Sequence, residues 1–164
     1  MISAYTLWKT AHILSAAILF GTGLGIAFFA WFGYRRALAS GEIAGLRSLL
    51  RLTVIADAWF TAPAVVFQAV SGLVLMDLNS WSLLSPWSIV VFSLFLLIGA
   101  LWLPVVVIQI LLSREADRVA SIADLTTRFH RRFGWWFALG IPAFTAVIVL
   151  FFLMVVKVLS VTGA

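Results

Sequence analysis

The chain has 164 residues, of which 64% are hydrophobic and only 10% are charged, and it contains no cysteine. Soluble domains carry about 25% charged residues, so this composition excludes a water-soluble protein and predicts one whose solvent is lipid. The lack of cysteine excludes disulfides, thiolate metal sites and thiol nucleophiles, and the net charge of +5 is better explained by loop charges at a membrane than by nucleic-acid binding.

Four apolar segments are long enough to span a bilayer, which takes roughly 20 residues each. They cover about residues 3–32, 53–76, 86–112 and 133–156. The first segment has no basic region before it and is too long for a signal-peptide core, so we expect no cleaved signal peptide. Because the connections are short, we expect an all-α protein in which the four helices pack antiparallel as a four-helix bundle, in a single membrane domain of residues 1–164.

The connecting segments differ in charge. The loops at 34–51 and 113–132 contain four and five arginines, whereas the loop at 77–85 contains one aspartate and no basic residue. By the positive-inside rule, both basic loops are predicted to be cytoplasmic and both termini to face outward, across the inner (cytoplasmic) membrane. The basic loops are expected to contact anionic lipids.

Two finer patterns concern the membrane surface. Residues 114–129 predict an amphipathic helix with Val119, Ile122 and Leu125 toward the membrane. Tryptophan rings favour the membrane–water interface. Five tryptophans are expected there: Trp8, Trp81, Trp87, Trp135 and Trp136.

The first span begins with Lys9 and His12 one turn apart, in the stretch LWKTAHIL. Residues three or four positions apart share a helix face, and this face is expected to turn inward, because an imidazole facing lipid would lack partners. The same face carries Tyr5, Ala16, Gly23 and Ala27. Gly21 and Gly25 form a G-x-x-x-G pattern that is typical of close helix packing. It is not a dinucleotide fingerprint, because position 26 is Ile and no strand precedes it.

The second span has a polar stripe that is also expected to face the interior. It consists of Asp57, Thr61, Gln68 and Ser71. Asp57 has two interpretations. It could favour a helix N-terminus and pair with an arginine across the bundle, Arg131 or Arg132. Alternatively, it could be a proton relay or a binding group, as intramembrane carboxylates are functional candidates by default.

The third and fourth spans add further polar groups. Trp102, Pro104 and Gln109 predict a kink with an amide near the inner end of the third span. The fourth span is expected to bend at Pro142, to place Met154 near the depth of His12, and to end with Lys157 as a snorkelling anchor.

His130 lies at the opposite membrane face from His12, in the basic run RFHRRFGWW. It is expected to lie among lipid head groups. The hydrocarbon core is about 30 Å thick, so one haem could not take both imidazoles as axial ligands.

Three roles are open for His12. It could be a satisfied buried histidine, hydrogen-bonded to a Ser, a Thr or a carbonyl group. It could ligate haem b within the bundle, with Met154 opposite, with five-coordinate iron or with another side chain in that position, and with Lys9 and Lys157 near the propionates. A quinone pocket is the third, since it needs a similar apolar cleft with few polar groups. Other metal sites lack ligands, and no Ser–His–acid set can be placed at one depth.

The chain resembles an uncharacterised family of bacterial four-span integral membrane proteins, a domain-of-unknown-function family. The stretches that carry the resemblance lie in all four spans: WKTAHIL, FGTGLGIAFF, IADAWFTAPAVVFQAVSGLVL, GALWLPVVVIQI and GIPAFTAVIVLFFLMVVK. This family implies no particular chemistry.

The opening LWKTAHIL...FGTGL is also distantly similar to the first helix of J-type protoporphyrinogen oxidases and copper-resistance D-like proteins. The first group binds haem b through a histidine in that helix, which maps onto His12. It also uses a lysine in a later span, and the second and third spans of this chain contain none. The resemblance therefore implies haem binding without the whole pattern of the oxidase.

Three functions follow as hypotheses. The first is a haem b protein of the membrane that acts with a membrane redox partner, either in electron transfer or in oxidation of a tetrapyrrole or quinol. The second is a non-catalytic membrane partner or assembly subunit that docks proteins or anionic lipids through its glycine face and basic loops. The third is a small oligomeric transporter with Asp57 as the coupling carboxylate. The catalytic residues of any reaction stay unknown at this stage.

Overall fold

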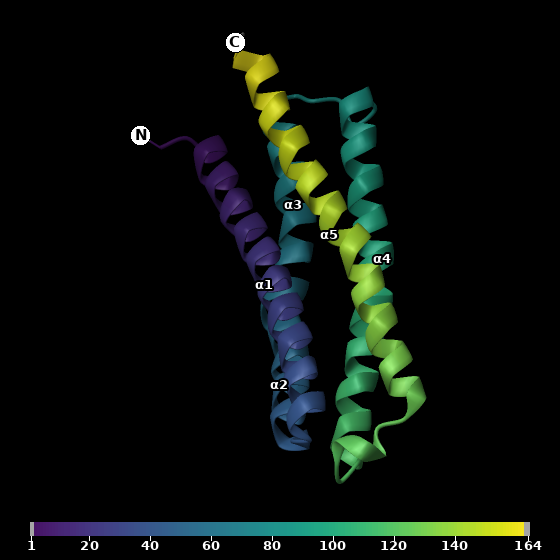
Figure 1. Ribbon diagram of the computed structural model, residues 1–164. Coiled ribbons are helices and arrows are strands. Elements are labelled where there is room, and N and C mark those ends of the chain that lie inside the picture. The colour runs from purple at the N-terminus through teal and green to yellow at the C-terminus, as the bar shows by residue number, and fades with distance from the viewer. Residues whose placement is uncertain (1, 163–164) are drawn as a thin grey trace.

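The computed structural model describes the backbone of residues 2–162 and the side chains of residues 2–156. Its elements follow one another as helices with short connections (Figure 1). They are α1 (Ala4–Ser40), α2 (Ile43–Ala56), the π-helical turn η1 (Asp57–Thr61), α3 (Ala62–Leu78), α4 (Pro86–Arg118), the 3₁₀ turn η2 (Ile122–Asp124) and α5 (Thr127–Thr162). The described residues contain no strand, which confirms the all-α prediction.

Four helical rods are long and apolar enough to cross a membrane, namely Ala4–Ser40, Ile43–Leu78, Pro86–Arg118 and Thr127–Val156. Each extends beyond the apolar segment expected from the sequence. Both termini and the 79–85 connection lie at one end of the bundle, which we call the terminal end (Figure 1). The two arginine-rich connections lie at the other, which we call the basic end. That the basic end is cytoplasmic stays a prediction from charge.

The connection between the first two rods is much shorter than the loop expected at 34–51. Helix α1 continues to Ser40, and α2 begins at Ile43. Gly41 ends α1 with a left-handed backbone (φ 73°), and its N–H donates to the Ala37 carbonyl at 2.9 Å. A glycine adopts this conformation at no steric cost, so a tight turn replaces the longer loop.

The predicted amphipathic helix over 114–129 is wrong in its second half. Helix α4 ends at Arg118, and α5 begins only at Thr127. Between them, Ser121 and Asp124 form a reciprocal capping box around η2. Such side-chain bonds to the backbone compete with a continuous helix. Leu125 is buried in the apolar core and does not face the membrane surface.

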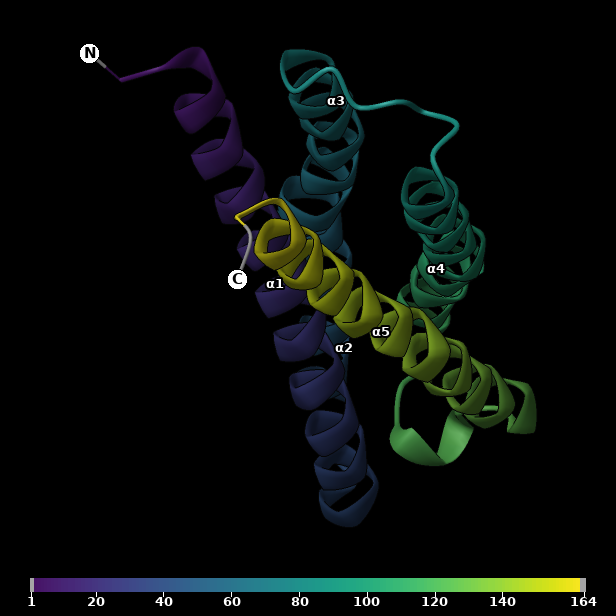
Figure 2. The same cartoon turned by 90° about the horizontal axis from the view of Figure 1, so that it is seen from above.

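The rods associate as two hairpins. Helix α4 packs closely against α5, and α1 packs against α2, η1 and α3. The hairpins join mainly through α2 and α4, with a smaller contact between α1 and α5. Figure 2 shows α5 crossing the bundle obliquely, from the side of α4 toward α1.

A contiguous apolar core occupies the half of the bundle nearer the basic end. Its members come from α1, α2, α4, α5 and the segment before α5: Ala30, Ala37, Ile43, Leu46, Leu50, Val105, Leu112, Ala116, Leu125, Phe129, Phe133 and Trp136. Trp136 is only 5% exposed. Its expected place at the membrane interface is therefore wrong, because it turns toward the core, whereas its neighbour Trp135 is exposed.

Glycine permits a close helix approach, but not at the expected residues. A Cβ atom placed on Gly33 of α1 would come within 2.2 Å of Leu49 of α2. At Gly21 and Gly25, an added Cβ would meet no neighbouring atom within 4 Å. The G-x-x-x-G pair therefore does not mediate packing inside this bundle, because α1 diverges from its neighbours on that face.

Candidate functional site

His12 lies at the contact of α1 and α3, in the terminal half of the bundle. Its Nδ1 is 2.7 Å from Ser71 Oγ. Ser71 is fully buried, and its hydroxyl donates to the Phe67 carbonyl of its own helix at 2.5 Å. A hydroxyl has one hydrogen, so Ser71 Oγ accepts the bond from the Nδ1–H of His12.

This bond determines which ring nitrogen is left to bind. In a neutral imidazole with its proton on Nδ1, Nε2 carries the free lone pair. No hydrogen bond among the described side chains uses His12 Nε2. The ring edge faces Gly72, whose added Cβ would lie in ordinary contact with His12 Cε1, at 3.6 Å.

The backbone around His12 is held as firmly as its ring. Gln68 Nε2 donates to the His12 carbonyl at 2.7 Å. One turn deeper, the buried Ser15 hydroxyl donates to the Ala64 carbonyl at 3.3 Å. Both bonds link α1 to α3, so Gln68 and Ser15 hold the two helices together. Ser15 was not among the residues expected at the site, although its i+3 spacing from His12 places it close to that face.

The other residues expected around His12 are less closely tied to it. Lys9 is half-buried, and its Nζ lies 5.5 Å from the centre of the Tyr5 ring. Met154 is half-buried on α5. The side chain of Lys157 lies outside the described residues. The hydrogen bonds of His12 among the described residues thus join it to α3.

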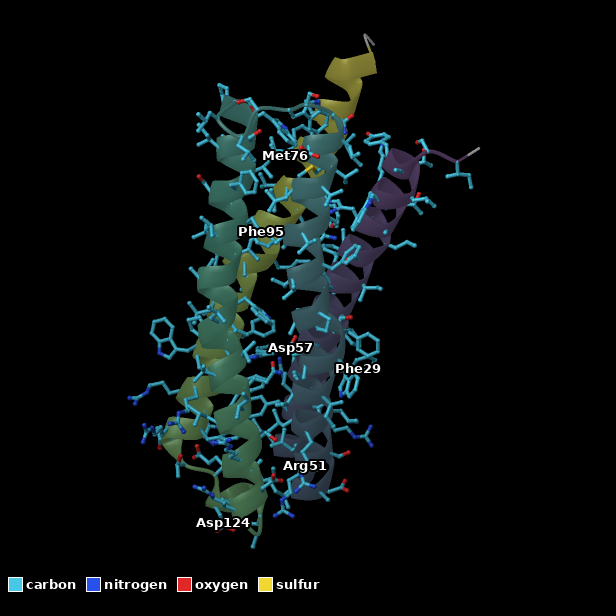
Figure 3. All side chains as sticks on the ribbon, turned by 180° about the vertical axis from the view of Figure 1, so that it is seen from behind. Phe29, Arg51, Asp57, Met76, Phe95 and Asp124 are labelled. Carbon is cyan, nitrogen blue, oxygen red and sulfur yellow. The ribbon has the colours of Figure 1, made fainter. Side chains whose placement is uncertain are left out.

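Asp57 forms a second polar site, about midway along the bundle and between the two hairpins (Figure 3). It is 7% exposed, and its Oδ2 accepts from Gln109 Nε2 at 2.9 Å. Trp136 Nε1 donates to Gln109 Oε1 at 3.2 Å. Because an indole N–H only donates, this bond orients the amide and turns its NH₂ group toward the carboxylate.

The local backbone at Asp57 is unusual. Residues 57–61 form a π-helical turn in which the Ala62 N–H donates to the Asp57 carbonyl. Pro63 follows directly, and a proline in a regular α-helix lacks an N–H and clashes with the carbonyl four residues earlier, here Trp59. The wider turn relieves this conflict. Such π turns occur frequently at functional sites.

Two more side chains flank the carboxyl group of Asp57, namely Thr61 and Trp102. Thr61 is 5% exposed, and its Oγ1 makes no hydrogen bond of standard geometry among the described groups. The cluster therefore contains one aspartate, polar donors from three rods and a buried hydroxyl that is still free to donate.

The expected pairing of Asp57 with Arg131 or Arg132 is wrong. Arg132 instead pairs with Glu115 at 2.9 Å, and Arg131 is exposed. Nor does Asp57 lie at a helix N-terminus, because α2 begins fourteen residues earlier, at Ile43. Gln109, which the sequence placed only near the inner end of the third span, lies inside the bundle and is 1% exposed.

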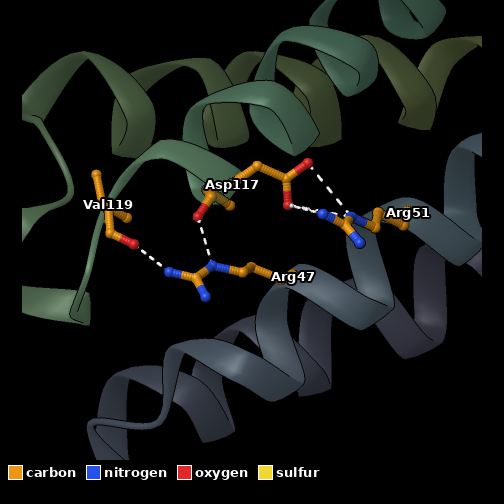
Figure 4. A network of polar contacts seen from close by, with 5 residues as sticks. Arg47, Arg51, Asp117 and Val119 are labelled. Carbon is orange, nitrogen blue, oxygen red and sulfur yellow. Dashed lines mark hydrogen bonds and ion pairs between the residues drawn. The ribbon is translucent and has the colours of Figure 1, made fainter.

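The basic end is held by arginine contacts from α2 to the end of α4 (Figure 4). Arg47 Nε donates to the Ala116 carbonyl at 2.9 Å, and its terminal nitrogen donates to the Val119 carbonyl. Arg51 pairs with Asp117 at 2.9 Å. Cations near the last carbonyls of a helix complement its dipole. These arginines therefore stabilise the contact between α2 and α4, in addition to giving this end of the bundle its positive charge.

His130 also has a protein partner. Its Nδ1 lies 2.5 Å from the Tyr34 hydroxyl, so the residue links α5 to α1. It is half-buried and is not simply a head-group contact. The separation of the two histidines toward opposite ends of the bundle agrees with the expectation that they do not share one haem.

Comparison with known proteins gives one match. Residues 6–158 match the family described as "Predicted integral membrane protein (DUF2269)". No curated protein and no solved structure matches the chain.

Proposed function

We propose, from the premise that this chain belongs to the DUF2269 family of integral membrane proteins, that it is a haem b-binding membrane protein. Its activity would be electron transfer or the oxidation of a tetrapyrrole or quinol. The observation that carries the proposal is the free Nε2 of His12, left by the bond between Nδ1 and Ser71.

The hydrogen bond of His12 to Ser71 supports this proposal. A metal-ligating histidine almost always donates its other ring N–H to an acceptor, which sets the tautomer and the ring orientation. Ser71 supplies that acceptor. Cofactor sites in four-helix bundles are built from side chains on facing helices, and His12 and Ser71 come from α1 and α3.

Each neighbouring residue has a separate task in this proposal. Ser71 orients the imidazole, and Gln68 of α3 holds the backbone of α1 at His12. Lys9 is a cation suited to a propionate, and Met154 is the candidate for a second axial ligand. A bound haem would supply one-electron chemistry at this position.

The test is an absorption spectrum of the detergent-purified protein, oxidised and dithionite-reduced, after expression with added haem precursor. We expect a Soret band and b-type reduced bands. They should be lost in His12→Ala and retained in His130→Ala, a matched control that removes the histidine near the other end. A flat visible spectrum from folded wild-type protein would contradict the proposal, and co-extraction of a quinone would then favour the quinone alternative.

A second candidate function is a non-catalytic partner subunit, favoured by the glycine pair of α1. Gly21 is exposed, and neither Gly21 nor Gly25 has a neighbour at its Cβ position. Small residues on a free face let another membrane helix approach closely. This role predicts a colourless protein that is captured with a partner or with its own copy, and whose capture is lost in Gly21→Leu but not in His12→Ala.

A further inference from the structure

Asp57 has an ionisable group in the middle of the bundle, and no cation among the described side chains lies against it. The ion pairs of these side chains join Arg51 to Asp117 and Arg132 to Glu115, both at the basic end. The contacts of Asp57 are instead a neutral amide, a threonine hydroxyl and an indole. An unpaired charged aspartate inside a membrane is unfavourable, so this site requires a positive charge or a proton.

We propose that Asp57 is a proton-binding site within the membrane, with the neutral carboxylic acid as its resting form and water as the source and acceptor of the proton. The neutral acid needs no counter-ion in a low-dielectric environment. It keeps an oxygen that accepts from Gln109 Nε2 and gains an O–H donor for a neighbouring acceptor.

The same surroundings can also hold the ionised form for a limited time. Gln109 already donates to Oδ2, and Trp136 fixes the amide in that orientation. The Thr61 hydroxyl is buried beside the carboxyl group and makes no hydrogen bond of standard geometry among the described residues, so it is a second available donor. A group that releases and rebinds a proton needs both states to be tolerated. The π turn between Asp57 and Thr61 provides a backbone element that can adjust between them.

Among the described side chains, no other titratable group on the elements around η1 bonds to Asp57. Toward the basic end, Tyr34 of α1 bonds to His130 of α5, Arg51 of α2 pairs with Asp117 of α4, and Arg132 of α5 pairs with Glu115 of α4. Arg47 of α2 donates to backbone carbonyls, and the other arginines of α1, α4 and α5 are exposed. Toward the terminal end, His12 of α1 bonds to Ser71, and Lys9 lies against the Tyr5 ring. On α3, Asp77 is exposed at the terminal end. Protonation of Asp57 is therefore set by its own cluster.

The test is infrared spectroscopy of the whole protein in lipid bilayers, in H₂O and in D₂O at neutral pH with choline as the cation. We expect a carboxylic-acid C=O band that shifts in D₂O, disappears reversibly at high pH and is absent from Asp57→Asn. Asp77→Asn, which removes an exposed carboxyl group, should keep the band. The measurement does not involve haem, so its outcome is independent of the function proposed for His12.

Three results would overturn the proposal. One is a wild-type protein without the band at neutral pH, which means an ionised Asp57. Another is a band that survives unchanged in Asp57→Asn. The third is loss of the band when Na⁺ replaces choline at constant pH, which makes the site a cation site. If Asp57→Asn does not fold, Asp57→Glu must move the frequency of the band, and an unmoved band counts against Asp57.

Discussion

The two halves of the bundle are held together in different ways. Near the basic end, large apolar and aromatic side chains form a contiguous core, and arginines tie α2 to α4. Toward the terminal end, the buried residues are mostly small or polar: Ser15, Ala64, Ser71, Met76, Ser88 and Ala146. Lipid supplies no hydrophobic drive between helices, so close packing and hydrogen bonds must hold each half.

The half near the basic end therefore stabilises the fold, whereas the terminal half contains the candidate site at His12. The tightly packed half fixes the relative positions of the rods and has little room for a ligand. The terminal half depends on a few hydrogen bonds, of which His12 to Ser71 and Gln68 to the His12 carbonyl are the shortest between α1 and α3. Asp57 lies where the two halves meet (Figure 3). Removing contacts from each half tests the distinction.

The largest loss of stability is expected from Phe129→Ala. Phe129 is 0% exposed in the core of the basic half, and truncating a buried Phe costs about 3–5 kcal/mol because it leaves a cavity. Unfolding in mixed micelles with increasing SDS measures this change. Phe152→Ala on the lipid-facing side, where the residue is 66% exposed, should change the unfolding free energy little. Equal losses in both variants would remove the case for a packed basic half.

A smaller loss is expected from Gly33→Ala. The added Cβ meets Leu49, and overpacking costs about 1–3 kcal/mol. Gly21→Ala is the matched control, because nothing lies near its Cβ position. Alanine is a better helix former than glycine, so this variant should be neutral or slightly more stable in the same assay. A large loss at Gly21 would reveal a partner helix on that face.

Ser71→Ala is expected to cost less again in stability and more in ligand binding. Side-chain hydrogen bonds between membrane helices contribute about 0.6 kcal/mol on average and about 1.7 at most. The variant frees His12 Nδ1, so haem affinity should fall about 10–100-fold, as for other partners of metal ligands. Haem titration of the apoprotein measures it. Ser93→Ala, an exposed serine on α4, should leave both quantities unchanged, and an unchanged haem affinity in Ser71→Ala would deny Ser71 its orienting role.

The smallest effect is expected from Arg51→Ala. Its ion pair with Asp117 is exposed, and exposed pairs contribute about 0–1 kcal/mol. Arg47→Ala should cost more, because Arg47 donates to two backbone carbonyls at the end of α4. SDS unfolding at low and high salt compares them. A larger loss of stability in Arg51→Ala than in Arg47→Ala would mean that the ion pair, rather than the bonds to the carbonyls of α4, stabilises the basic end.

Several features could be predicted from particular residues. The length and polarity of the apolar runs predicted four membrane helices, and helical spacing placed Thr61, Ser71 and Asp57 on one buried face. These are local properties of one helix. The polar face of α1 was also predicted, although Ser15, the buried polar residue of this helix, was not expected on it.

The partners across the bundle could not be predicted, because they depend on how each rod is rotated. Asp57 binds Gln109 rather than an arginine, and Trp136 turns inward although Trp135 beside it does not. Two further features were not predicted although the sequence contains a local signal for each. Pro63 explains the π turn at Asp57. The Ser121–Asp124 spacing is that of a capping box, which interrupts the amphipathic helix expected there.

The most direct measurement of the role of His12 is chemical rescue of His12→Gly with free imidazole. If Nε2 of His12 ligates haem, the purified variant should lack the b-type spectrum, and imidazole should restore it by occupying the vacated position. Added imidazole should leave the spectrum of His130→Gly as it was. A variant that keeps its haem spectrum without imidazole would show that the ligand is another residue and would contradict the role proposed for His12.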